Sequence, residues 1–98
     1  MKIISDLVNN MDDEIEMAKI YAQNFLIYNA DNNVQWADRF RQMAYESVDH
    51  ADVLHQLAVE TIEKMQRKYV PPEEMVKAWK KEHVNYVNTV NWIRDMIK

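Results

Sequence analysis

The fold of this chain follows from residues 37–65, which read ADRFRQMAYESVDHADVLHQLAVETIEKM. Small and apolar residues recur there at alternating three- and four-residue steps, which is the spacing of one face of an α-helix. They are Ala37, Phe40, Ala44, Ser47, Ala51, Leu54, Ala58, Ile62 and Met65. No glycine or proline interrupts this pattern. We therefore predict one long helix over about residues 34–68 as the centre of the fold.

The same periodicity continues on both sides of this helix. About residues 3–29 form a second predicted helix, with an apolar stripe made of Ile4, Val8, Met11, Ile15, Ala18, Ala22 and Phe25. About residues 72–97 form a third, which opens with Pro72-Glu73-Glu74, a favourable helix start. Its inward set is Val76, Trp79, His83, Tyr86, Val90, Ile93 and Ile97. Because the connections are short, the sequence predicts an all-α, antiparallel up-down-up three-helix bundle in a single domain, residues 1–98.

Composition excludes several classes of function. The chain has 98 residues, a formal charge of −4, no glycine and no cysteine. Glycine-rich phosphate loops, disulfides and thiolate metal sites are therefore excluded, and any metal must be held by carboxylate or imidazole groups. The acidic balance predicts no nucleic-acid partner and no membrane partner. The sequence shows neither a signal-like start nor an apolar run of membrane-spanning length, so we expect a cytoplasmic protein.

Groups that could bind a metal lie near the middle of each predicted helix. Glu14 borders the apolar stripe of the first helix, where an ionised carboxylate needs a partner. Glu46 and His50 are four residues apart on one face of the second helix, among apolar neighbours, so we expect His50 to be at least half buried. Glu82 and His83 lie on the third helix. These residues are the candidates for a site.

The second helix resembles a known family. Residues 40–54 are similar to the second helix of rubrerythrin-type ferritin-like proteins, whose pattern is F-x3-A-x2-E-x2-H-A-x2-L. The matching positions are Phe40, Ala44, His50, Ala51 and Leu54. Glu14 with Tyr21 resembles the glutamate and tyrosine of that family's first helix, and Glu82 with Tyr86 resembles the E-x3-Y element of its third. The resemblance covers roughly residues 11–58 well.

The resemblance implies a di-iron carboxylate ancestry, with peroxide reduction or iron oxidation as the activities of the family. Two departures change what we expect of this chain. Ser47 stands where the family pattern has a bridging carboxylate, so the E-x-x-H motif is broken. The family's fourth helix, with its second E-x-x-H, has no counterpart among the three predicted helices. We therefore expect metal binding rather than catalysis, in a homo-oligomer that completes the bundle.

The resemblance also implies roles for particular residues. The metal would be iron or another divalent ion, with no other cofactor, and the predicted ligands are Glu14, Glu46, His50 and Glu82. Tyr21 and Tyr86 would orient these carboxylates by hydrogen bonds. His55 is not included, because five residues turn a straight helix by about 140° relative to His50.

Two other interpretations stay open. In the first, Glu14 pairs with His50 or accepts a tyrosine hydroxyl as part of a purely structural network. In the second, the chain is a non-enzymatic helical module, such as an inhibitor or sequestering protein, that binds a protein or a small ligand without metal. This second interpretation rests on Trp92 and a ladder of uncharged polar residues beside it, namely Asn85, Asn88 and Asn91. Self-association is predicted from apolar residues off the main stripes, which are Met17, Leu26, Trp36 and Trp92.

Overall fold

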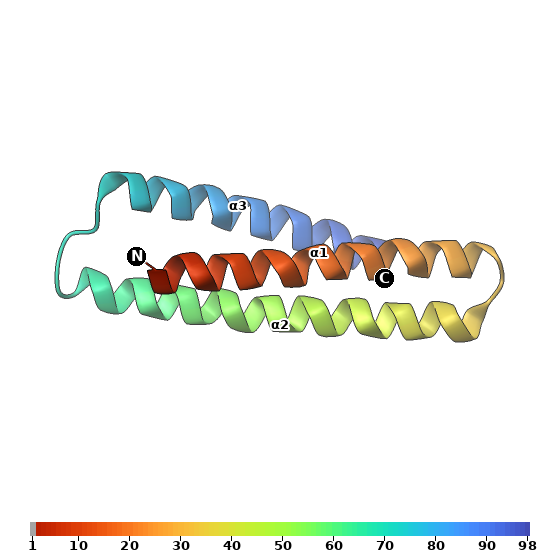
Figure 1. Ribbon diagram of the computed structural model, residues 1–98. Coiled ribbons are helices and arrows are strands. Elements are labelled where there is room, and N and C mark those ends of the chain that lie inside the picture. Colours follow the sequence, from red (N-terminus) through yellow and green to blue (C-terminus); the bar gives the residue numbers. More distant parts are fainter. Residues whose placement is uncertain (1) are drawn as a thin grey trace.

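The computed structural model describes residues 2–98, which form three α-helices. They are α1 (Lys2–Ala30), α2 (Val34–Gln66) and α3 (Glu73–Met96). Figure 1 shows α1 and α2 running antiparallel as a long hairpin, with α3 returning along one side of it. The predicted all-α, up-down-up arrangement is therefore confirmed. Two of the observed limits differ slightly from the prediction, because α2 ends at Gln66 rather than near residue 68 and α3 begins at Glu73.

The two connections are built from residues that favour turns. Asn33 caps α2, since its side-chain oxygen accepts a hydrogen bond from the Trp36 backbone N–H at 3.4 Å. Asn32 has a φ of 60°, a left-handed conformation that asparagine adopts more easily than most residues. Pro72 precedes α3, and Glu73 and Glu74 place acidic groups in its first turn. These residues fix the points at which the chain reverses.

Small side chains hold α1 and α2 close together. Four alanines of α2 repeat every seven residues along the face toward α1, and each is at most 1% exposed: Ala37, Ala44, Ala51 and Ala58. Ala18 and Ala22 of α1 are fully buried opposite this row. We call these six residues the alanine seam. The distance between two packed helices depends on the size of the side chains at their contact, and alanine is small. The backbones of α1 and α2 therefore approach each other much more closely than either approaches α3.

The predicted apolar stripes form most of the core. The main cluster of buried residues comprises Met11, Ile15, Ala18, Ala22, Ala44, Val48, Ala51, Tyr86, Val90, Ile93 and Ile97. A second cluster of Ile4, Ile62 and Met65 packs against Met75 and Trp79 of α3. The prediction that His83 points inward is wrong, because its side chain lies at the exposed edge of the interface between α2 and α3.

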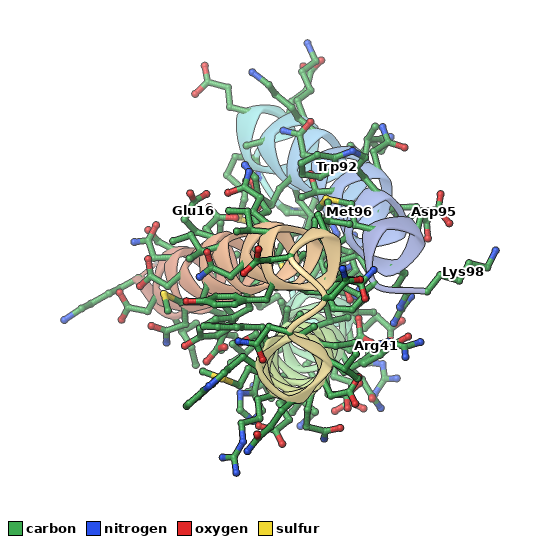
Figure 2. The ribbon with its side chains drawn as sticks, turned by 90° about the vertical axis from the view of Figure 1, so that its right-hand side faces the viewer. Glu16, Arg41, Trp92, Asp95, Met96 and Lys98 are labelled. Atoms are coloured by element: carbon green, nitrogen blue, oxygen red, sulfur yellow. The ribbon has the colours of Figure 1, made fainter. Side chains whose placement is uncertain are left out.

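The end of α3 is tied to α2 by polar contacts. The Arg41 and Tyr45 side chains both donate hydrogen bonds to the backbone carbonyl of Ile97. Arg94 forms an ion pair with Asp52 at 2.9 Å. In the end-on view of Figure 2, Arg41 lies beside the end of α3, and Lys98 extends away from the hairpin.

Because α3 occupies one groove of the α1–α2 hairpin, the opposite groove is uncovered within residues 2–98. We call this uncovered side the open face. Several large apolar side chains are exposed along it, namely Met17, Trp36, Met43 and Leu57. Glu14, Tyr21 and His50 line the same groove. Within residues 2–98, none of the helices combines the length and apolar character needed to cross a bilayer.

The alanine seam predicts a strong dependence of stability on side-chain size. Ala51→Leu should lower the free energy of unfolding by about 1–3 kcal/mol, because a larger side chain forces the two backbones apart. For a domain of this size, the melting temperature should fall by about 4–8 °C for each kcal/mol, followed by circular dichroism at 222 nm. Ala30→Leu, at the exposed end of α1, is the control and should change little. Equal melting temperatures for the two variants would contradict close packing at the seam.

Candidate metal-binding site on the open face

Glu14 of α1 and His50 of α2 face each other across the open face. The Nδ1 atom of His50 lies 3.5 Å from Oε2 of Glu14. Both side chains line a surface hollow of about 310 Å³, together with Met17, Tyr21, Met43, Glu46 and Ser47. The structure thus brings a carboxylate and an imidazole together from the two helices in which the sequence placed them.

The pair lies at the surface rather than in the core. The Glu14 side chain is 32% exposed, and the His50 side chain is 63% exposed. Our expectation that His50 is at least half buried is therefore wrong. The physical reason is that α3 covers the other groove of the hairpin, so no helix within residues 2–98 packs over the His50 side. A group placed there is open to solvent and to a further ligand or chain.

Glu46 and Ser47 flank the same hollow. Glu46 is exposed and accepts a hydrogen bond from the Gln42 side chain at 3.1 Å. Ser47 is buried, only 6% exposed, at the edge of the alanine seam. The position where the resemblance implies a bridging carboxylate therefore does face the hollow, but it supplies a short hydroxyl in tight packing.

Glu82 does not join Glu14, Glu46 and His50. It lines a different hollow, together with Ser5, Trp79 and others, and shares a hydrogen bond with Asp12 of α1. Asp12 precedes Glu14 by two residues, which places the two side chains about 160° apart around the helix. The hydrogen bond to Asp12, burial and the negative charge of Asp12 raise the pKa of Glu82 to about 7. The four predicted ligands therefore do not meet. Glu14, Glu46 and His50 line one hollow, and Glu82 lines another on a different side of α1.

The two tyrosines also separate. Tyr21 lines the hollow beside Glu14 and packs against Phe40, with ring centroids 6.4 Å apart. Tyr86 is buried between α2 and α3 and stacks on His55 at 4.3 Å between centroids. Tyr21 is thus placed to orient a group in the hollow, whereas Tyr86 packs in the interface on the other side of the hairpin.

Residues 2–98 of one chain do not provide a complete di-iron centre. Among residues 2–98, no group of three or more histidine, aspartate or glutamate side chains is close enough to hold one ion. A centre of two irons needs bridging carboxylates, and Ser47 cannot supply one. The donors present in a single chain therefore do not fit a di-iron site. What one chain offers is a half-site, the Glu14–His50 pair, with Glu46 at its edge.

The sequence did not predict a contact between two histidines, one on α2 and one on α3. Nε2 of His55 and Nδ1 of His83 lie 2.9 Å apart, joining α2 to α3. The angle between His55 and His50 around α2 prevents them from sharing an ion, but it does not exclude a partner for His55 on another helix. A usable signal was present, because Val48, His55 and Ile62 are spaced by seven, which places His55 on a line with two buried residues.

The residues behind the binding-module interpretation are at the surface. Asn85, Asn88 and Asn91 are exposed along α3, and Trp92 is 49% exposed. No contact within residues 2–98 distinguishes this surface from a solvated one, so the interpretation stays a prediction.

The Asp12–Glu82 contact predicts a pH effect with a defined sign. A carboxyl group whose pKa is raised by folding stabilises the folded state at low pH, and this contribution is lost as pH rises. For Glu82 the loss should occur between pH 4.5 and about 7. Glu82→Gln imitates the protonated form, so its free energy of unfolding should increase relative to wild type over that range, measured by urea denaturation at several pH values. Glu63→Gln, at an exposed site of α2, is the control, and a pH-independent difference between Glu82→Gln and wild type would contradict the assignment.

Comparison with known proteins finds no match to this chain among family models, curated proteins or solved structures. The ferritin-like assignment therefore stays a prediction, based on the residues of α1 and α2 described above.

Proposed function

We propose that this chain is a divergent ferritin-like helical protein that binds a divalent metal ion, such as iron, between two copies of itself. The observation that carries the proposal is the Glu14–His50 pair, 3.5 Å apart and open to solvent on a face that α3 does not cover. The proposed ligands are Glu14, His50 and Glu46, contributed by both chains. Glu82 is not part of this site.

The open face favours a second copy of the chain as its cover. Exposed Met17, Trp36, Met43 and Leu57 give this face apolar area on both sides of the half-site. In a two-fold dimer the same patch is used by both partners, so residues near the axis meet their own copies. The half-sites of two chains would then supply at least two carboxylates and two imidazoles. Iron, manganese and zinc all accept such a mixed set of oxygen and nitrogen ligands.

These residues are suited to binding a metal ion rather than to catalysing a reaction on it. Glu14 supplies negative charge, and His50, 3.5 Å from it, supplies a nitrogen donor. Tyr21 lines the hollow and can donate a hydrogen bond to a carboxylate there, which would fix its orientation. With Ser47 in place of the bridging carboxylate, we propose storage, sequestration or sensing of a metal, without a redox cycle.

Metal analysis of the purified protein tests this proposal. Protein loaded with iron(II) under anaerobic conditions should retain metal in a dimer or larger assembly, measured by native mass spectrometry. Glu14→Gln and His50→Gln should each lose the metal, because each removes a ligand from both copies. Loading should also raise the melting temperature of the wild type, since a ligand that binds only the folded state stabilises it.

Glu63→Gln is the matched control for this experiment. Glu63 is exposed on α2 and does not line the hollow, so the variant should retain metal as the wild type does. The proposal is wrong if the wild type retains no metal at any loading, or if Glu14→Gln retains as much as the wild type. A monomeric, metal-free protein of normal stability would instead favour the structural interpretation of the Glu14–His50 pair.

A further inference from the structure

The interface between α2 and α3 contains two imidazoles that point at one another. Nε2 of His55 and Nδ1 of His83 are separated by 2.9 Å, with ring centroids 5.0 Å apart. The distance between centroids exceeds the distance between nitrogens by almost the sum of the two ring radii. The two nitrogen atoms therefore lie between the ring centres and face each other. One of the two nitrogens donates a hydrogen bond to the other, and both ring edges face the same space between α2 and α3.

The surroundings of His55 hold its ring in this orientation. Tyr86 stacks on it at 4.3 Å with an angle of 7° between the planes, and Trp79 lies at 5.6 Å on α3. His83 is exposed, so its ring has room to rotate. One nitrogen donor is therefore fixed by packing, and the other is adjustable.

Charge and solvation at this position keep an imidazole lone pair available. Burial and the neighbouring His83 lower the pKa of His55, and the nearby Asp52 only partly opposes this effect. Asp52 lies one turn before His55 on α2, where it pairs with Arg94 of α3. A neutral His55 is the form that can bind a metal, because a protonated nitrogen has no lone pair to give.

We propose that His55 and His83 form a binding site for a zinc-like transition-metal dication that clamps α3 onto α2. Zinc binds imidazole nitrogen at about 2.0–2.1 Å, so two nitrogens of a tetrahedral site lie roughly 3.3 Å apart. Metal binding would replace the direct hydrogen bond of 2.9 Å, and the exposed His83 ring would rotate so that both nitrogens point at the ion. Water would complete the coordination, because the His83 side of the pair is open to solvent.

This site is distinct from the proposed iron site and does not depend on it. Glu14 and His50 lie on the open face, whereas His55 and His83 lie in the groove occupied by α3. The two sites also differ in chemistry, since a pair of imidazoles suits zinc, copper and nickel better than it suits hard oxygen-seeking ions. Metal bound here would strengthen the contact between α2 and α3, the pair of helices with the fewest close backbone approaches.

Proton NMR of the imidazoles during titration with zinc tests the proposal. The chain has three histidines, so the ring resonances can be assigned completely with the variants His50→Gln, His55→Gln and His83→Gln. We expect zinc to shift the resonances of both His55 and His83 at one equivalent per chain, and to raise the melting temperature. In the His50→Gln background, which removes the imidazole of the open face, His83→Gln should lose both effects, and the circular dichroism spectrum of the double variant should show that the helices are intact. His50→Gln should retain both effects.

The possible outcomes separate this proposal from the proposed function. If zinc shifts only His50, the His55–His83 site is wrong while a metal site on the open face is supported. If zinc shifts none of the three, the His55–His83 contact is a hydrogen bond only, and the proposal is overturned. If zinc still shifts the His55 resonance in His83→Gln at the concentration that shifts it in the wild type, the proposal is overturned as well.

Discussion

The close approach of α1 and α2 through the alanine seam is the constraint on which the rest of the structure depends. Alanines at every seventh position of α2 leave no bulk between the helices, so the side chains beside the seam come within reach of one another. This is why Glu14 can contact His50 across two helices at 3.5 Å. It also explains why Ser47, next to the seam, is small and buried. The geometry of the candidate site is therefore a consequence of packing.

The position of α3 determines which polar groups are covered and which are open. By packing into one groove of the hairpin, α3 covers the side that carries His55 and leaves the side that carries His50 uncovered. Two residues in the interfaces that α3 forms with the hairpin, Glu82 and His55, affect stability in opposite directions when pH changes. Glu82 favours the docked state when protonated, whereas His55 favours it when neutral, since its pKa is lowered by burial. Protonation therefore acts on these two contacts of α3 in opposite directions.

Much of the fold could be predicted from the sequence because helical periodicity and turn residues are local signals. The stripes from Ile4 to Ala22 and from Ala37 to Met65 became buried faces, and the helices end close to the predicted residues. The sequence does not predict which side of the α1–α2 hairpin α3 packs against. The side is determined by the packing of all three helices together. As a result, His50 and His83 are both exposed, although we expected His50 to be at least half buried and His83 to point inward. The Glu14–His50 contact could be predicted because it lies within the hairpin, whereas the Asp12–Glu82 and His55–His83 contacts depend on α3.

A crystal structure of the protein grown anaerobically with iron(II), with anomalous scattering recorded at the iron edge, tests the central claim most directly. The account predicts an anomalous peak between Glu14 and His50, at an interface in which the open faces of two copies meet. Glu14 and His50 side chains that point apart, or an open face that carries neither iron nor a second copy, would contradict it.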